Sequence, residues 1–216
     1  MNRTLPLIAL FLVASLILCN AQDSIPKISK TVFGVKLGVN CSKFSASINS
    51  ESRAKAGLAL GFYLKTQIGR YLYFRPEIYY SNQGQKDNYL YQYGSGPSVG
   101  RTTTAMHYVN LPILLEVGKK VTFQFGLQLG ILVKGTEKGT IQSVKVNDDL
   151  NGTMAKTDVS AVFGVGLSPT ARINCGARVN LGVSNIYTPD TSANQTGVSP
   201  PTVENRVLHF YVGYSF

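Results

Sequence analysis

One stretch of the sequence, "KVTFQFGLQLGILV" at Lys120–Val133, alternates between apolar and polar residues with almost no errors. One side carries Val121, Phe123, Phe125, Leu127, Leu129, Ile131 and Val133. The other side carries Thr122, Gln124, Gly126, Gln128 and Gly130, and Leu132 is the exception. Successive side chains of a β-strand point to opposite faces, so this period of two predicts a strand with one apolar and one polar face.

The same alternation recurs along the whole chain. It is found in "TVFGVKLGVNC", "GLALGFYLK", "YLYFRPEIYY", "VNLPILLEV", "VSAVFGVGL", "ARINCGARVNLGV" and the closing "VLHFYVGYSF". Together with the first stretch these segments predict about eight strands. No segment has the spacing of a convincing amphipathic helix. The sequence therefore predicts an all-β protein.

The connections between these strands alternate between long and short. The long ones are expected at Ser42–Lys55, Ser81–Thr104, Lys134–Thr157 and Ser184–Asn205, and they are rich in Gly, Ser, Asn, Thr and Pro. The short ones are "TQIGR", "GKK" and "SPT". Short turns at one end and long loops at the other are typical of outer-membrane barrels.

The composition of the two faces indicates which one meets lipid. A soluble sandwich or a lipocalin-like barrel would turn the apolar face inward and carry many charges outside. Here the polar face is largely Gly, Asn, Gln, Thr and Ser, which suits the narrow interior of an eight-stranded barrel. Turned outward, the apolar face makes a band of roughly the 25 Å that a bilayer requires. We therefore predict an eight-stranded antiparallel up-and-down transmembrane β-barrel with a polar lumen.

Aromatic residues near the predicted strand ends fit this orientation. Tyr and Trp are enriched where a membrane meets water, and small barrels carry aromatic girdles at both interfaces. The residues expected in these girdles are Phe33, Tyr80, Phe123, Tyr214 and Phe216.

The N-terminus has the layout of a secretory signal peptide. Arg3 is followed by the apolar run Leu5–Leu18 and by small residues before Gln22. We expect a signal peptide at 1–21, cleaved between Ala21 and Gln22, and a single barrel domain at 22–216. Lipidation of Cys19 is the alternative, but it usually requires a small residue in place of Leu18.

Two cysteines remain after cleavage, Cys41 and Cys175, and both fall on apolar strand faces. A disulfide is allowed in an exported protein, but we interpret these residues as small hydrophobic side chains.

The chain is basic, with a formal net charge of +10. This charge suits anionic partners such as lipid phosphates, whereas the scattered basic residues do not indicate a nucleic-acid partner. The cations expected near the rim could pair with lipopolysaccharide phosphates, and the alternative is ordinary solvated charge. They are Lys43, Lys55, Arg101, Lys134 and Lys156.

A set of charged residues falls on the polar, inward face. Because a charge removed from water must be paired, we interpret these residues as structural ion pairs of the lumen rather than as an acid/base site. They are Lys36, Lys65, Arg75, Glu77, Glu116, Arg172 and Arg178.

No residue pattern predicts catalysis, a metal or a cofactor. His107 is expected at the long-loop rim and His209 in the lumen, and two isolated histidines do not form a metal site. Ser81, Asp87 and His107 are the only candidates for an acyl-transfer site at the rim, and their spacing is not diagnostic. We therefore expect that the protein is not an enzyme.

The long loops are the better candidates for function, because binding surfaces often lie on loops held by a rigid scaffold. "NYLYQYGSG" carries Tyr89, Tyr91 and Tyr93, which can form a contact surface. The alternative is that these tyrosines extend a hairpin above the membrane.

Four segments, "FGVKLGVNCSKFS", "FRPEIYYSNQG", "YVNLPILLEVG" and "HFYVGYSF", resemble in order the PorT-type or porin-family outer-membrane β-barrel proteins. This resemblance covers about Thr31 to Phe216 and implies a small OmpA- or OmpX-like barrel in the bacterial outer membrane. Its final strand, with Tyr214 and Phe216, looks like the signal that the barrel-assembly machinery recognises.

Three roles follow as hypotheses. The first is a barrel with a filled polar lumen and a structural or loop-mediated role, in contact with outer-membrane lipid, lipopolysaccharide and other envelope proteins. The second, implied by one branch of the resembling family, is a component of an outer-membrane secretion or transport system. The third is a soluble periplasmic lipocalin-like binding barrel.

Overall fold

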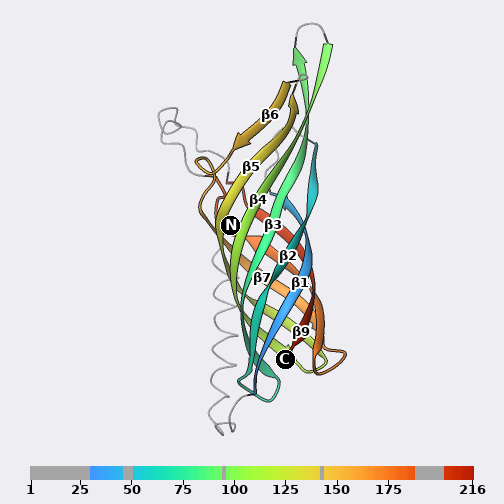
Figure 1. The fold of residues 1–216 in the computed structure, drawn as a ribbon, viewed down its shortest axis with the longest axis vertical. Helices are drawn as coiled ribbons and strands as arrows, with labels where there is room; N and C mark the ends of the chain where they lie inside the picture. The colour runs from blue at the N-terminus through green and yellow to red at the C-terminus, as the bar shows by residue number, and fades with distance from the viewer. Residues whose placement is uncertain (1–29, 46–50, 94–95, 142–143, 188–201) are drawn as a thin grey trace, which may run out of the picture. The chain divides into compact units, whose positions relative to one another are not determined.

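The structure, a computed structural model, describes residues 30–45, 51–93, 96–141, 144–187 and 202–216 (Figure 1). The expected signal peptide, with its cleavage site at Ala21 and Gln22, lies outside the described residues and remains a prediction. No helix within the described ranges is long and apolar enough to cross a membrane.

The described residues form nine strands. They are β1 (Thr31–Phe44), β2 (Glu51–Gln67), β3 (Leu72–Tyr93), β4 (Gly96–Gly118), β5 (Val121–Ile141), β6 (Val144–Asp149), β7 (Thr157–Leu167), β8 (Ile173–Gly182) and β9 (Asn205–Ser215).

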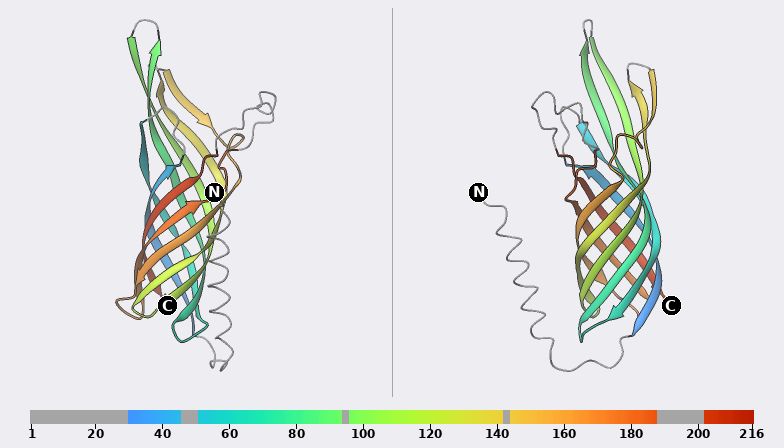
Figure 2. Two further views of the ribbon diagram at one scale, coloured as in Figure 1. Left: turned by 180° about the vertical axis from the view of Figure 1, so that it is seen from behind. Right: turned by 90° about the vertical axis from the view of Figure 1, so that its left-hand side faces the viewer.

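Eight of these strands close into a ring. Every strand pairing is antiparallel, and β1 pairs with β9, as in Val35 opposite Tyr214. The order runs β4-β3-β2-β1-β9-β8-β7-β5, and β4 pairs with β5 to complete the circle, while β6 pairs with β5 outside it (Figure 2). The predicted all-β, eight-stranded antiparallel up-and-down barrel is confirmed. Closure leaves no open strand edge in the barrel wall. An open edge would expose unpaired backbone groups to lipid, where they have no hydrogen-bond partner.

Burial follows the period-two pattern of the sequence, with the apolar face outside. In β9 the residues from Asn205 to Ser215 alternate strictly between buried and exposed. The exposed members are Arg206, Leu208, Phe210, Val212 and Tyr214, whereas His209 and Tyr211 are buried. The lumen therefore contains the polar face.

The segment Ser81–Thr104, expected as a long loop, is instead the upper part of a β-hairpin. Strands β3 and β4 stay paired from Leu72 opposite Val117 up to Tyr93 opposite Gly96, and the hairpin stands beyond the barrel (Figure 1). Its backbone bonds are satisfied by the partner strand rather than by water, so a composition rich in Ser, Asn and Gly did not prevent strand formation. Tyr89, Tyr91 and Tyr93 lie in this paired region, and their side chains are outside the described set.

The segment Lys134–Thr157 was also expected to be a loop, and this prediction is wrong for the first half of the segment. Strand β5 continues to Ile141 and pairs with β6, from Thr136 opposite Asp149 to Ile141 opposite Val144. The residues between β6 and Thr157 form turns that lead back to the barrel.

The short connections at the opposite end are tight, as expected. Gly118 begins the β4–β5 turn with φ +131°, and a Cβ there would lie 2.1 Å from the backbone oxygen of Val121. Only glycine adopts this conformation without strain.

We expect Gly118→Val to destabilise the barrel by about 1–3 kcal/mol, because the strained φ and the backbone clash combine. Gly152→Val is the matched control, since a Cβ at Gly152 meets nothing within 4 Å. Urea unfolding in lipid vesicles measures both variants. Equal midpoints for the two variants would show that the turn does not depend on glycine.

Candidate functional site: the filled lumen and the outer rim

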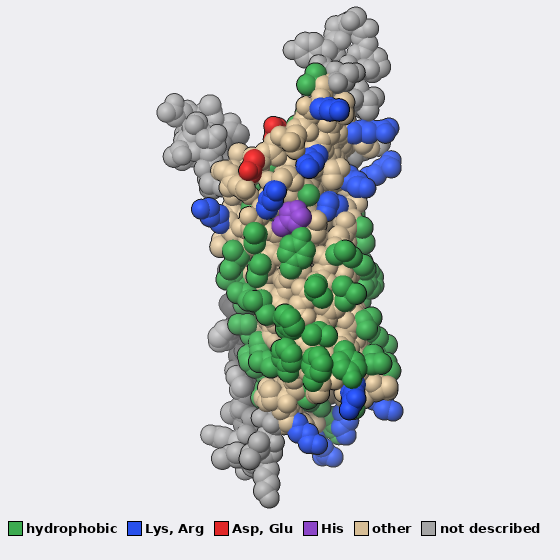
Figure 3. All heavy atoms as spheres, viewed as in Figure 1, with side chains coloured by type: hydrophobic (Ala, Val, Ile, Leu, Met, Phe, Trp, Pro, Cys, Tyr) green, Lys and Arg blue, Asp and Glu red, His purple; other side chains and the backbone are tan. Residues whose placement is uncertain are grey.

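The outer wall of the barrel is apolar around the described strands. Leu127 is 63% exposed near the middle of the membrane-facing part of β5, and Val121 and Val133 lie near its two ends. Figure 3 shows apolar side chains in a band across the visible face of the barrel, with Lys and Arg side chains gathered above and below it. A soluble protein rarely exposes apolar surface on this scale, so the wall is built to face lipid.

Aromatic side chains mark both edges of this band. At the short-turn end, Phe33 stacks on Phe62 and on Phe216, each with ring centroids 5.8 Å apart, and Tyr214 packs edge-on against Phe216. At the hairpin end, Tyr80 stacks on His107. The five residues expected in the girdles all lie on the exposed face.

Inside the barrel, Glu77 is the centre of a buried charge cluster. Its carboxylate accepts hydrogen bonds from Lys36 Nζ, from Arg75 Nε at 2.8 Å, and from Arg178 Nη2 at 2.7 Å and Nη1 at 2.8 Å. The Glu77 side chain has no exposed surface. Three cations from β1, β3 and β8 therefore converge on one carboxylate and tie distant parts of the wall together.

Glu116 extends the cluster toward the short-turn end. It accepts from Lys65 Nζ at 2.5 Å, from Arg75 Nη1 at 3.1 Å and from the Gln124 amide at 3.0 Å. Arg75 thus bridges the two carboxylates. Lys65 is the one cation of the cluster with noticeable exposure, 19% of its side chain.

The cluster holds more cations than carboxylates, and tyrosine rings face the excess charge. Lys36 Nζ lies 3.8 Å from the Tyr79 ring centroid. The Arg75 guanidinium lies 4.2 Å from that of Tyr63, and the Arg178 guanidinium 4.5 Å from that of Tyr211. Aromatic faces attract cations most strongly where water is excluded, so these rings stabilise the uncompensated charge.

The structure places six of the predicted lumen residues in this cluster: Lys36, Lys65, Arg75, Glu77, Glu116 and Arg178. The seventh prediction, Arg172, is wrong. Strand β8 begins at Ile173, so Arg172 belongs to the preceding turn, where it is exposed and its Nη1 lies 3.4 Å from the Tyr214 hydroxyl.

Sequence reasoning named the lumen charges but missed the tyrosines that pack among them. Tyr63, Tyr79 and Tyr211 are buried, and each falls on the polar face of its strand. Their position on the polar face was the signal available in the sequence, because a large aromatic side chain among glycines and amides would fill a narrow lumen.

The outer mouth of the barrel is closed by an apolar cluster that the sequence analysis did not predict. It consists of the buried residues Phe44, Met106, Tyr108, Met154, Ile186 and Val203, with Leu132 and Leu150 packed against them. The segments that carry Met154 and Ile186 are joined by a hydrogen bond from Ala155 N to Ile186 O of 2.8 Å. Polar and charged side chains are buried in the lumen below this cluster.

The acyl-transfer candidates do not form a site. Ser81 is fully buried in the lumen and bonds to Asn40, whereas His107 lies on the outer face beside Tyr80. Ser81 and His107 thus lie on opposite sides of the wall, and Asp87 is buried against Gln85. His209 lies in the lumen, as expected, stacked between Tyr79 and Tyr211. No group of metal-binding side chains occurs in the described ranges.

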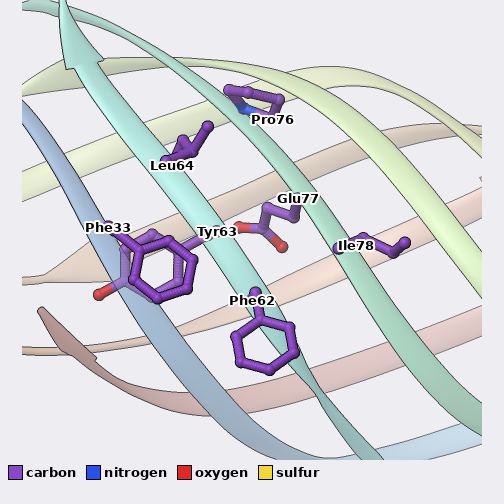
Figure 4. A pocket seen from close by; sticks show the side chains of 7 residues that line it. All are labelled: Phe33, Phe62, Tyr63, Leu64, Pro76, Glu77 and Ile78. Atoms are coloured by element: carbon purple, nitrogen blue, oxygen red, sulfur yellow. The ribbon is translucent and has the colours of Figure 1, made fainter.

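The lipid-facing wall carries an apolar groove beside Pro76. Phe33, Phe62, Leu64 and Ile78 line this groove of about 300 Å³ (Figure 4). Proline has no backbone N–H, and the β2–β3 pairing is interrupted between Tyr63–Glu77 and Thr66–Phe74, where Pro76 lies. The two cysteines also lie in the wall, and both are free.

The rim cations predicted from the sequence lie either outside the strands that carry the apolar band or at the upper ends of those strands. The side chains of these cations are at the surface. Lys43, Arg101, Lys134 and Lys156 are exposed, and Lys55 is half-buried.

A closed eight-stranded barrel with a lipid-facing wall and a polar interior defines the class of outer-membrane β-barrel proteins. Residues 20–188 match the family described as "Outer membrane protein beta-barrel domain", and the chain belongs to this family. It is accordingly a protein of the bacterial outer membrane.

Two solved structures are similar to this chain. Neisserial surface protein A is 13% identical with a TM-score of 0.51, and the alignment covers 85% of this chain and 97% of that one. The attachment invasion locus protein Ail of Yersinia pestis, solved with the heparin analogue sucrose octasulfate, is 9% identical with a TM-score of 0.46, covering 88% of this chain and 100% of that one. No curated protein sequence matches the chain. The alternative of a soluble periplasmic barrel is wrong, because the apolar face of the strands is outside.

Proposed function

We propose that this protein is a non-conducting outer-membrane barrel whose role is structural or interactive and is carried by the hairpins that it holds outside the membrane. The observation that carries this proposal is the filled interior. The Glu77 and Glu116 ion pairs occupy the short-turn half, and the apolar cluster around Met106 closes the mouth. With the lumen blocked, the hairpins are the parts left for partners.

The shape of the hairpins supports this proposal. They form a paired sheet rather than disordered loops, so their surface is held in one arrangement by the barrel below. Strand β6 ends the strand order, and its outer edge has no strand partner among the described residues. Exposed strand edges and tyrosine-rich hairpins are common protein-binding surfaces.

Three kinds of partner belong to this proposal. The apolar band contacts outer-membrane lipid, and the rim cations pair with lipopolysaccharide phosphates. The final strand, with Tyr214 and Phe216 exposed at its end, is the segment that the barrel-assembly machinery receives. Other envelope proteins bind the hairpins. The protein has no catalytic role in this account, a view supported by the separation of Ser81 from His107.

Site-specific photo-crosslinking in intact cells tests the hairpin role. A photoreactive residue at Lys86 or Lys138, both exposed on the hairpins, is expected to give a discrete protein adduct. The control position is Lys119, which is exposed in a short turn at the other end of the barrel. No adduct from either hairpin position, in cells where the barrel is folded, would contradict the proposal.

A second candidate is a component of an outer-membrane secretion system, which the resemblance of "FRPEIYYSNQG" and "YVNLPILLEVG" to PorT-type proteins favours. Deleting the gene would then block export of surface proteins. Unchanged export in the deletion strain would rule this candidate out.

A further inference from the structure

A group of basic side chains on the outer wall, just above the apolar band, has cross-strand geometry suited to a ligand. Asn82 of β3 lies opposite His107 of β4, and His107 lies opposite Lys134 of β5. From β2, Lys55 Nζ donates a hydrogen bond to Asn82 Oδ1. Four neighbouring strands therefore present a lysine, an amide, an imidazole and a second lysine side by side.

The charges of this group are not balanced by the protein. The Lys134 ammonium group has no hydrogen bond or ion pair in the described part of the chain, and the Lys55 ammonium group donates there only to the neutral Asn82 amide. Burial and then the ammonium groups of Lys55 and Lys134 hold the pKa of His107 below its usual value. Burial and then Lys86 lower the pKa of Lys55 in the same way. Like charges brought together without a counter-ion are destabilising, and an anion would relieve this cost.

The imidazole is oriented so that one nitrogen remains available. His107 Nδ1 bonds to the Tyr80 hydroxyl, and the two rings stack with centroids 5.9 Å apart. No hydrogen bond among the described residues uses His107 Nε2. When the Tyr80 hydroxyl donates to Nδ1, Nε2 carries the proton and can donate to an acceptor.

The position of the group indicates the kind of anion. Tyr80 is 42% exposed at the upper edge of the apolar band, and Ile131 and Val133 lie directly below Lys134 on the same wall. Figure 3 shows a histidine side chain directly above this band, with Lys or Arg side chains on both sides of it. In a bilayer this is the level of the lipid headgroups, where a phosphate is the strongest available acceptor.

We propose that Lys55, His107 and Lys134 form a binding site for the phosphate group of a lipid headgroup in the outer leaflet. The two lysines contribute charge from either side, and His107 Nε2 donates a directed hydrogen bond between them. This inference rests on the proposed contact between rim cations and lipid phosphates, and it narrows that contact to three side chains.

The test uses the full-length mature protein, folded in an uncharged glucoside detergent and labelled with carbon-13 in its histidine rings. Lipopolysaccharide, phosphatidylglycerol, dephosphorylated lipopolysaccharide and inorganic phosphate are titrated separately. Binding affinity and the NMR shift of His107 are recorded, with the buried His209 as an internal reference. A bound phosphate supplies the missing negative charge, so we expect the pKa of His107 to rise on binding.

Charge-matched variants separate this site from general attraction. The double variant Lys55→Gln/Lys134→Gln is expected to bind the phosphorylated lipids about tenfold more weakly. The double variant Lys119→Gln/Lys120→Gln, in the short turn at the other end, loses the same charge and is expected to bind as the unaltered protein does. His107→Gln keeps a donor and is expected to weaken binding less than the double lysine variant.

The outcomes distinguish the possible ligands. A stronger response to lipopolysaccharide assigns the source to that lipid, and a stronger response to phosphatidylglycerol assigns it to phospholipid; both support the site. An equal response to inorganic phosphate, or to dephosphorylated lipid, would overturn it. If lipopolysaccharide binds but the two double variants lose affinity equally, the proposal of a three-residue site is contradicted. The proposed general contact between rim cations and lipid phosphates is not contradicted by that result. If the unaltered protein binds neither lipopolysaccharide nor phosphatidylglycerol, both fail.

Discussion

Replacing Glu77 with glutamine is expected to destabilise the folded barrel by about 3–5 kcal/mol. The change keeps the size of the side chain but leaves Lys36, Arg75 and Arg178 in the lumen without their shared carboxylate. Buried charges that lose a partner are not rescued by water, and the tyrosine rings compensate only part of the cost. Urea unfolding in lipid vesicles, followed by the mobility of boiled and unboiled samples in gels, measures the loss.

Two further variants show whether charge is the cause. Glu137→Gln removes a carboxylate from the hairpin, where it makes no ion pair in the described part of the chain, and is expected to change stability by less than about 0.5 kcal/mol. Adding Lys36→Met to Glu77→Gln removes one unpaired cation and is expected to restore part of the stability. A Glu77→Gln barrel as stable as the unaltered protein would mean that the charge cluster does not hold the wall together.

Replacing Leu127 with arginine is expected to destabilise the membrane-inserted barrel by about 2–4 kcal/mol. Leu127 is opposite Ile113 on β4 and Ala161 on β7, near the middle of the lipid-facing face of β5. An arginine there must bring its charge into the hydrocarbon or extend far to reach the headgroups. The same vesicle unfolding experiment measures the effect.

The control for this prediction lies on the same strand. Val133 is 60% exposed at the upper end of the band, and Val133→Arg is expected to cost no more than about 1 kcal/mol because its charge lies near the interface. Equal effects of the two arginines would argue against the assigned depth of β5 in the membrane.

The barrel was predictable because it depends on a local pattern. Alternation places Leu127 outside and Gln128 inside, and this does not depend on which strand lies beside β5. The turn around Gly118 limits where β4 ends. The long hairpins were not predictable in this way. Above the membrane neither face of β3 or β4 needs a regular apolar pattern, so Lys86 and Thr103 pair without any alternation that signals a strand.

The candidate site was predictable in its members but not in its contacts. Phase alone places Lys36 and Glu77 in the lumen, but their pairing depends on the stagger of β1 against β3, which are not neighbours in the barrel. Arg172 was misplaced because the predicted strand began two residues too early, inside the turn before β8. The apolar cluster was missed because Met154 and Ile186 lie in connecting segments without an alternating pattern, and their burial depends on how those segments fold over the mouth.

Single-channel recording in a planar lipid bilayer tests the filled lumen most directly. The protein, folded and shown to be inserted by its gel mobility, is expected to give no steady current above that of the bilayer alone, because ion-paired side chains fill one half of the interior and the apolar cluster around Met106 closes the other. A steady, large conductance from most inserted molecules would contradict the account, since it would require a continuous water-filled path through the barrel.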